Sequence, residues 1–465
     1  MSKRIKKRKV KRRPSKRPSS QSKPLLSLAM MVKNEEEFLE DALLSAKGFC
    51  DELIVVDTGS TDRTVEIAHD LGATVSHFPW INDFSAARNE TLRCANGQWV
   101  AILDADERFV GERPETIRQF LKPGPHYPFQ AIMLNVTNTR LDGSPISSFY
   151  SVRVFPRDPR LGYTGRVHNR FGALVDDAPK IDATRYSSLT INHLGYDPGL
   201  YQARQKAARS LPLIEATVRD EPNNHQQRFY LGREYLMLGR YGDAEAALRL
   251  AYAGIKATGQ GPLADTADHL IRVLLATGGT AEEIIQIAHE TLQKHPEHPD
   301  LWFNLGKGLA KAGARPQAID AVERALHHLT KPGFAEQVYL RHHHWEAWEL
   351  LGALYWEAAR YKDAYAAYQK TLAGKPDESN GWPTLLNNVC ALAIEFNDDQ
   401  ALPGLFQRLF GCPDAPLGMF FFYVEKIART QGGQAAQKLL ANGVQHCPRM
   451  AQNGEYVALH SKLGG

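Results

Sequence analysis

The first half of the chain alternates short apolar runs with amphipathic segments. Four apolar runs of five to eight residues predict buried strands, at residues 25–32, 52–57, 73–78 and 99–103. Three intervening segments have apolar residues at helical spacing, at residues 35–47, 61–71 and 84–95. Asp83 is the predicted N-cap of the third helix. Strands that alternate with helices in this way predict a parallel sheet built from right-handed βαβ units.

Residues from about 110 to 200 have a weaker pattern. Strand-like pieces lie at 129–136, 149–155 and 188–193, and Gly, Pro and Asp separate them. We interpret them as a mixed sheet that completes the first domain and lines an acceptor site.

A helical repeat replaces the strand patterns beyond about residue 200. The same spacing of large and small residues occurs three times. Each copy contains a Leu-Gly pair, which is Leu231-Gly232, Leu305-Gly306 or Leu351-Gly352. These copies resemble tetratricopeptide repeats, whose period is about 34 residues. Their spacing predicts a degenerate copy near residues 262–296 and an insertion near 331–344. One helix pair cannot bury its own apolar face, so the array is predicted to stack into a solenoid with a concave surface.

The composition is typical of a folded protein with more than one domain. A chain of 465 residues is too long for one ordinary core, and its apolar fraction is 43%. There is no run of about 18 apolar residues, which argues against a membrane span. The five cysteines lie far apart without a Cys-x-x-Cys pair, so the sequence indicates neither a disulfide framework nor a zinc site and favours a reducing cytosol.

The charge is divided unequally along the chain. Residues 1–24 contain 12 Lys or Arg and no acid, which leaves 44 basic against 52 acidic residues in the remainder. We predict that this tail is disordered. Its charge favours a phosphate-rich partner such as an anionic membrane surface, with nucleic acid less favoured, and a solubilising arm without a dedicated partner is the alternative.

Two aspartates stand at the tip of the fourth predicted strand, in the sequence V-A-I-L-D-A-D-E-R at residues 100–108. Side chains alternate along a strand, so Asp104 and Asp106 are predicted to project to the same side. Their carboxylates are the hard oxygen ligands that suit Mg²⁺ or Mn²⁺. An acidic turn without a ligand is the alternative.

A third carboxylate ends the second predicted strand, in V-V-D-T-G-S-T-D at residues 55–62. Asp57 at the strand tip is suited to accept hydrogen bonds from a base or ribose, and the small residues after it leave room for a nucleotide. Asp62 is more simply interpreted as favouring the helix N-terminus through the helix dipole.

Four motifs follow one another in the first predicted domain. They are M-M-V-K-N-E-E at 30–36, V-V-D-T-G-S-T-D at 55–62, W-I-N-D-F-S-A-A-R-N at 80–89 and L-D-A-D-E at 103–107. In this order and spacing they resemble the family 2 glycosyltransferases with a GT-A fold, and more narrowly the bacterial branch in which tetratricopeptide repeats follow the catalytic domain. The resemblance implies a GT-A domain with a Rossmann-like mixed α/β sheet at residues 25–200, and an all-α repeat solenoid at 201–465.

The resemblance implies a role for each matching residue. Asp57 would contact the nucleotide base of a nucleotide-sugar donor, and Asp104 the ribose or the metal. Asp106 would coordinate the Mn²⁺ or Mg²⁺ ion that bridges the diphosphate and neutralises the charge of the leaving group. Arg88 would lie near the nucleotide, and an ion pair that closes its helix against the sheet is the alternative.

Two histidines follow these motifs. A late histidine often serves GT-A enzymes as a metal ligand, which here would be His193, and a structural hydrogen bond is the alternative. Related chains commonly have His-Glu where this chain has His168-Asn169, and that glutamate would act as general base. Asparagine cannot accept a proton, so the base would be His168 or one of the nearby acids Asp176 and Asp177, or would be unnecessary for a thiolate nucleophile.

These features predict a metal-dependent glycosyltransferase, inverting by resemblance, that moves a sugar from a nucleotide-sugar donor to a protein or peptide acceptor. The concave repeat surface would recognise that acceptor. A lipid-linked or envelope polysaccharide acceptor is the first alternative, and a non-catalytic scaffold with a degenerate nucleotide-sugar domain is the second. We expect a cytoplasmic location, with a peripheral position at the inner membrane face if the basic tail binds lipid.

Overall fold

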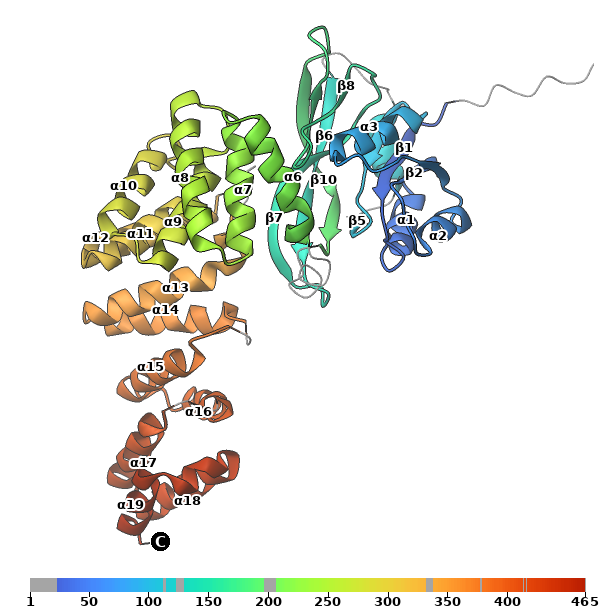
Figure 1. Cartoon of the computed structure of the whole chain (residues 1–465). Helices are drawn as coiled ribbons and strands as arrows, with labels where there is room; N and C mark the ends of the chain where they lie inside the picture. Colours follow the sequence, from blue (N-terminus) through green and yellow to red (C-terminus); the bar gives the residue numbers. More distant parts are fainter. Residues whose placement is uncertain are drawn as a thin grey trace, which may run out of the picture. The chain divides into compact units, whose positions relative to one another are not determined.

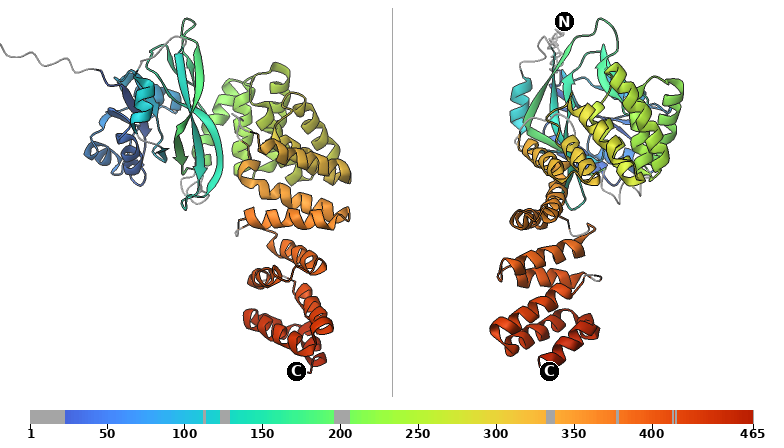
Figure 2. Two further views of the ribbon diagram at one scale, coloured as in Figure 1. Left: turned by 180° about the vertical axis from the view of Figure 1, so that it is seen from behind. Right: turned by 90° about the vertical axis from the view of Figure 1, so that its left-hand side faces the viewer.

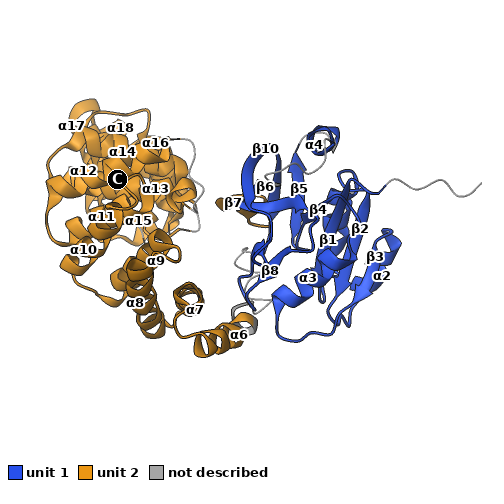
Figure 3. Ribbon diagram, turned by 90° about the horizontal axis from the view of Figure 1, so that it is seen from above, with its two compact units in different colours: residues 1–137, 150–195 blue, residues 138–149, 196–465 orange. Residues whose placement is uncertain are grey.

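A computed structural model describes residues 23–111, 114–122, 129–195, 206–331, 338–376, 379–412, 414 and 416–464. The predicted basic tail lies outside the described residues except for Lys23 and Pro24, and so does the predicted domain boundary at residue 200. The chain divides into two compact units, residues 1–137 with 150–195 and residues 138–149 with 196–465 (Figure 3). In the described part of the chain, no helix combines the length and the apolar character that crossing a membrane requires.

The α/β part of the chain contains ten strands and four helices among its described residues (Figure 1). The strands are β1 (Leu26–Val32), β2 (Glu52–Asp57), β3 (Thr74–His77), β4 (Trp99–Ile102), β5 (Glu107–Gly111), β6 (Phe129–Thr139), β7 (Pro145–Pro156), β8 (Leu161–Thr164), β9 (Arg170–Ala173) and β10 (Ile181–His193). The helices are α1 (Leu39–Lys47), α2 (Thr64–Asp70), α3 (Phe84–Cys94) and α4 (Pro114–Leu121).

Eight of these strands form one mixed sheet in the order β3-β2-β1-β4-β7-β6-β10-β5. The four strands expected from the apolar runs are parallel, as predicted, with Val32 opposite Asp57 and Asp57 opposite His77. The remaining strands add antiparallel pairs, β4 with β7 and β5 with β10, so the sheet is mixed. The strand order reverses between β1 and β4, which is where open α/β sheets bind ligands.

Three predicted helices are present, and two begin later than predicted. Asp83 caps α3 by accepting a hydrogen bond from the Ala86 backbone N–H at 3.0 Å, as the sequence predicted. Helices α1 and α2 begin at Leu39 and Thr64 because the preceding residues form turns after β1 and β2. The core between α3 and the sheet is apolar and includes Ala29, Ile54, Val100 and Ile102.

The second unit is helical from residue 206 onward in its described residues, and Figure 2 shows its helices from two further sides. The helices are α6 (Lys206–Asp220), α7 (His225–Met237), α8 (Tyr241–Thr258), α9 (Leu263–Thr277), α10 (Ala281–Leu292), α11 (Pro299–Lys311), α12 (Arg315–Leu329), α13 (Leu340–Glu357), α14 (Tyr361–Gly374), α15 (Trp382–Glu395), α16 (Leu402–Gly411), α17 (Gly418–Gln431), α18 (Gly433–His446) and α19 (Gly454–Lys462), with a 3-10 turn η1 (Pro448–Gln452).

The repeat glycines lie where two helices of a pair approach closely. A Cβ atom on Gly232 would meet Leu248, one on Gly306 would meet Val322, and one on Gly352 would meet Tyr368. The partner stands 16 positions after the glycine in all three pairs, so each repeat has the same contact. The degenerate copy expected near residues 262–296 is the pair α9 and α10. Residues 332–337 of the expected insertion lie outside the described residues, and helix α13 begins at Leu340 within it.

Candidate active site

The candidate site lies at the carboxyl edge of the parallel strands. Because β3, β2, β1 and β4 are neighbours, the residues that follow them meet at this edge. Asp57 ends β2, His77 ends β3 and Asp104 follows β4 by two residues. A crevice outside the carboxyl ends of parallel strands is the usual ligand site of such a sheet.

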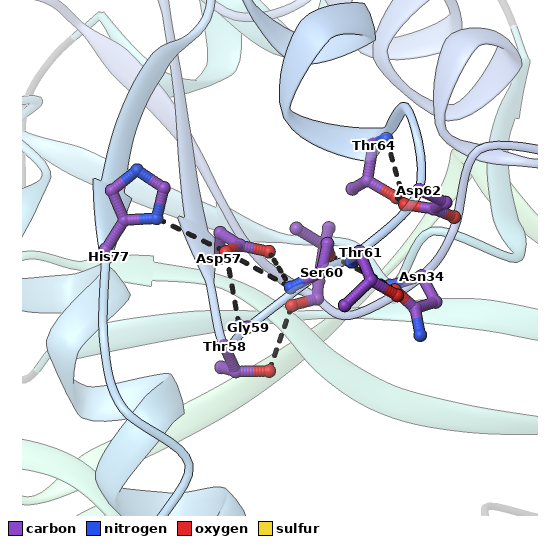
Figure 4. A network of polar contacts seen from close by, with 10 residues as sticks. Asn34, Asp57, Thr58, Gly59, Ser60, Thr61, Asp62, Thr64 and His77 are labelled. Carbon is purple, nitrogen blue, oxygen red and sulfur yellow. Dashed lines mark hydrogen bonds and ion pairs between the residues drawn. The ribbon is translucent and has the colours of Figure 1, made fainter.

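Asp57 is held in a turn that fixes its carboxylate. The side chain accepts backbone hydrogen bonds from Gly59 at 3.1 Å and Ser60 at 3.0 Å, and its Oδ2 lies 3.2 Å from His77 Nδ1 (Figure 4). Burial raises the pKa of Asp57, but the hydrogen bonds from Ser60, Gly59 and His77 outweigh it and leave the pKa below its usual value. The carboxylate is therefore ionised and oriented before any ligand arrives.

The loops after β1 and β2 are joined by hydrogen bonds. Asn34 donates its backbone N–H to Ser60 Oγ at 2.9 Å, and its side-chain oxygen accepts the Thr61 backbone N–H at 2.8 Å (Figure 4). Asn34 has a φ of 53°, a left-handed conformation that asparagine tolerates better than most residues. Asp62 accepts hydrogen bonds from Thr64 and the Glu36 backbone, which agrees with its expected role at the start of a helix.

Arg88 forms an ion pair with Asp104. Its Nη2 donates to Asp104 Oδ1 at 2.7 Å, and the guanidinium lies 5.3 Å from the centre of the Tyr163 ring. Burial raises the pKa of Asp104. The positive charges of Arg88 and Arg153 lower it by a larger amount, so the pKa is below its usual value. This geometry corresponds to the alternative for Arg88, in which the ion pair connects helix α3 to the end of β4.

A second buried ion pair lies beside the first. Both oxygens of Glu107 accept hydrogen bonds from Arg153, at 2.8 and 2.7 Å, and Glu107 Oε2 also accepts the Asp104 backbone N–H at 2.9 Å. Glu107 is 1% exposed. This contact holds the backbone of Asp104 in place, because a charged acceptor forms a stronger hydrogen bond than a neutral one.

The two aspartates of the fourth motif lie in a turn rather than on the strand. Strand β4 ends at Ile102, and Glu107 N–H donates to the Asp104 carbonyl at 3.0 Å. The alternation of side chains along a strand therefore does not determine their directions, and the expectation that both project to the same side stays a prediction. The side chain of Asp104 is 37% exposed, whereas that of Asp106 is 8% exposed.

Asp106 lies beside the predicted late histidine. Its Oδ1 is 3.5 Å from Nε2 of His193. His193 is the last residue of β10 and pairs with Glu107 of β5. Among the described residues, no group of three or more His, Cys, Asp or Glu side chains is close enough to hold a metal ion. Mg²⁺ commonly takes only one or two carboxylates, with waters and substrate phosphates completing its shell, so a carboxylate and an imidazole at this edge fit a cation shared with a diphosphate.

His168 lies in the loop between β8 and β9, which rests on the start of α3. Phe84 N–H donates to the Arg166 carbonyl at 2.9 Å, and Ser85 Oγ donates to the Gly165 carbonyl at 2.5 Å. His168 is half-buried with a φ of 49°, and Asn169 beside it is half-buried as well. Asp176 and Asp177, the alternative bases, are exposed.

The sequence interpretation assigned no role to several residues of this edge. The sequence pattern predicts no role for Glu107, Arg153 or His77. Arg153 stands within the apolar strand β7, and a lone arginine in such a run is the available indication of a buried ion pair. His77 ends its strand with a side chain that is 69% exposed, and nothing in its local sequence indicates the contact with Asp57.

Comparison with known proteins agrees with the resemblance drawn from the motifs. Residues 27–189 match the model of glycosyl transferase family 2, and residues 200–262 match a tetratricopeptide repeat model. A TPR repeat-containing protein of Synechococcus elongatus is 33% identical over 239 residues, which are 50% of this chain and 56% of that protein. The SPbeta prophage-derived glycosyltransferase SunS of Bacillus subtilis is 27% identical over 232 residues, which are 48% of this chain and 51% of that protein.

The chain thus spans about half the length of the curated relatives it matches. Among solved structures, the C-terminal part of a TPR repeat-containing protein from Cytophaga hutchinsonii is 16% identical and aligns with 56% of this chain and 97% of that chain, at a TM-score of 0.39. The edge described above lies inside the matched residues 27–189. Residues 27–189 are therefore a glycosyl transferase family 2 domain, and tetratricopeptide repeats follow it from residue 200.

Proposed function

We propose that this chain is a metal-dependent glycosyltransferase that moves a sugar from a nucleotide-sugar donor to a protein or peptide acceptor. The observation that carries the proposal is the set of ionised, fixed carboxylates at the carboxyl edge of a family 2 glycosyltransferase domain. Such an edge binds nucleotides in open α/β sheets. The named glycosyltransferase among its relatives supports the same activity.

The donor would bind across the loops after β1, β2 and β4. Asp57 would accept hydrogen bonds from the nucleotide base, and Gly59, Ser60 and His77 would hold that carboxylate in place. Asp104 would contact the ribose or the metal with Oδ2, since Arg88 occupies Oδ1. In this arrangement Arg88 positions Asp104 and has no direct contact with the nucleotide.

The residues suited to hold a Mn²⁺ or Mg²⁺ ion are Asp106 and His193, with substrate phosphates and waters as further ligands. Asp104, the third predicted ligand, does not form a three-residue metal site with them in the described structure, so we place it at the ribose or at a water of the ion. Carboxylates are hard ligands that such ions prefer, and an imidazole suits Mn²⁺ as well. When bound, the ion would neutralise charge on the nucleoside diphosphate leaving group. Arg88 and Arg153 balance part of the negative charge that these carboxylates bring together.

His168 is the proposed general base on the acceptor, because Asn169 beside it cannot accept a proton. Attack on the sugar from the face opposite the diphosphate would invert its anomeric carbon. A nucleophile that is already ionised, such as a thiolate, would not need this base.

The repeats are the proposed acceptor-binding part, because a concave helical array suits an extended peptide. A lipid-linked acceptor is the second candidate, which the 12 basic residues of segment 1–24 favour. An intact-mass screen of candidate acceptors against a panel of nucleotide sugars would separate the two candidates.

A donor-hydrolysis assay with Mn²⁺ tests the metal assignment without any knowledge of the acceptor. We expect Asp106→Asn to lower turnover by a factor of order 10² or more, because the amide loses the charge that holds the cation. Asp70→Asn is the matched control, because Asp70 is exposed at the end of α2. Unchanged turnover of Asp106→Asn would contradict the metal assignment, and no hydrolysis by the wild-type chain with any donor in the panel would contradict the enzymatic function.

A further inference from the structure

The helical unit contains an open cavity of about 770 Å³ between α11, α13 and the turn that precedes α15. Its lining includes Phe303 and Lys307 of α11, Trp345 and Glu349 of α13, and Lys375 after α14. Neither the sequence motifs nor the glycosyltransferase domain accounts for this cavity. Its volume is within the range of ligand sites, which is roughly 300–1,000 Å³.

Lys307 has no hydrogen-bond acceptor among the described residues. Its Nζ lies 3.9 Å from the centre of the Phe303 ring, and its nearest carboxylate oxygen, on Glu346, is 3.8 Å away. The side chain is 28% exposed, and burial lowers the pKa of the ammonium group. An ammonium carries three N–H donors, so leaving them without acceptors in a partly buried place is costly.

The acidic side chains around Lys307 are already engaged. Glu346 Oε1 accepts a hydrogen bond from the Tyr339 hydroxyl at 2.5 Å. Both oxygens of Glu349 accept hydrogen bonds from Lys375, at 3.0 and 2.7 Å, and the Lys375 side chain is only 2% exposed. Glu349 therefore serves Lys375, and Glu346 uses Oε1 for Tyr339 while its Oε2 forms a long ion pair with Lys307, beyond hydrogen-bond distance.

A second donor in the cavity wall also lacks an acceptor. The indole N–H of Trp345 is buried and has no hydrogen-bond partner in the described part of the chain. Lys307 and Trp345 are thus two donors of the lining that have no hydrogen-bond acceptor among the described residues. A ligand that complements this cavity therefore presents acceptor oxygens, and a negative charge beside Lys307 gains the most.

We propose that this cavity binds an acidic side chain of the acceptor peptide, with Lys307 as the partner of its carboxylate. The inference rests on the proposed function and deepens it, because it specifies the acceptor as a peptide that contains a Glu or Asp. An extended peptide also brings backbone carbonyls, which are acceptors for the remaining donors of the lining. Helix α11 packs against α9 and α13, so these helices extend the helical surface beside the cavity.

Retention of peptides on the immobilised full-length chain tests the proposal directly. The probes are two C-terminally amidated peptide libraries that are randomised around a central residue, which is Glu in one library and Gln in the other. Mass spectrometry measures the retained fraction of each. We expect the wild-type chain to retain the Glu library about tenfold better, the gain of one charged hydrogen bond, and Lys307→Met to reduce this preference to about one.

Two controls separate this result from misfolding and from failure of the glycosyltransferase proposal. Lys311→Met, on the same helix but exposed and outside the cavity, keeps the preference, and an unchanged thermal transition shows that Lys307→Met is folded. Asp106→Asn also keeps the preference, because retention requires no sugar transfer. Equal retention of both libraries by the wild-type chain, or an undiminished preference in Lys307→Met, would overturn the proposal. Failure of donor hydrolysis with a normal Glu preference would instead count against the proposed enzymatic function alone.

Discussion

At the scale of single residues, Glu107 shows how a structural charge supports a candidate functional one. It neutralises Arg153 and accepts the backbone N–H of Asp104, so it acts on the position of the aspartate rather than on a ligand. Its side chain is 1% exposed, so it is not a ligand-binding group. The acidic motif therefore combines half-buried Asp104 and buried Asp106 with a glutamate whose role is structural.

Glu107→Gln is expected to destabilise the α/β unit by about 3–5 kcal/mol, because it leaves the buried guanidinium of Arg153 without a counter-charge. Urea unfolding followed by circular dichroism measures the change. Glu66→Gln is the matched control, because the pair of Glu66 with Arg63 is exposed and its loss should have little effect. A change no larger than that of the control would show that the buried pair contributes little.

Asp300 gives the helical unit a specific pH dependence. The residue is 3% exposed, and burial together with the charge of Asp268 raises its pKa to about 7 from an ordinary value of 3.8. Between these values the folded state holds a proton that the unfolded state has lost, so the contribution of Asp300 to stability falls as pH rises through this window. We expect the unfolding midpoint of the wild-type chain to fall relative to that of Asp300→Asn from about pH 4 to pH 7.

Above pH 7 the two unfolding midpoints should change in parallel, because Asp300 is then ionised in both states. The amide that replaces the carboxyl in Asp300→Asn cannot titrate, so the difference between the two proteins isolates this carboxyl from other groups such as His269. Parallel profiles over the whole range would show that the pKa of Asp300 is not raised.

At the scale of elements, a repeat glycine and a helix glycine outside the repeat contact predict substitutions of opposite sign. Gly306→Ala places a methyl group against Val322 and is expected to destabilise the chain by about 1–3 kcal/mol. Gly242→Ala lies in α8 with nothing within 4 Å of its Cβ position, and it should be neutral or stabilising by up to about 1 kcal/mol. Denaturant midpoints of both variants measure the difference, and equal effects would contradict close packing at Gly306.

Elements with regular periodicity were predictable from the sequence. The four parallel strands and the helix pairs with a Leu-Gly step follow local patterns of apolar residues, and so does the Asp83 cap. Strand β5 and the hairpin of β8 and β9 were not predicted, because each of these strands has only four or five residues. The pairing partner of β5 is also distant in the sequence.

The candidate site was predictable only in part. The identity of its carboxylates followed from motifs at strand ends, whereas their partners did not. The pairing of Arg88 with Asp104 and of Glu107 with Arg153 depends on strand order and side-chain packing, which no local pattern contains. The sequence around Lys307 does not indicate a binding role, because the lack of a hydrogen-bond acceptor depends on the three-dimensional surroundings of the side chain.

At the scale of the whole molecule, the two proposed binding tasks belong to different units. The donor residues lie in unit 1 and the Lys307 cavity lies in unit 2. Substitutions that share no interaction partners usually have additive effects on stability. The decreases in the free energy of unfolding caused by Asp106→Asn and Lys307→Met should therefore add in the double variant.

The register of the large sheet also bears on how the chain reaches its folded state. Strand β5 pairs with β10, with Gly111 opposite Leu189, so these partners are 78 positions apart in the sequence. Within the repeats, Gly306 meets Val322 after a single short turn. Closing a long loop costs entropy before its contacts form, and chains rich in local contacts fold faster. The helix pairs should therefore form early, while the β5–β10 edge closes last and is the step at which newly made chains are most exposed to misfolding.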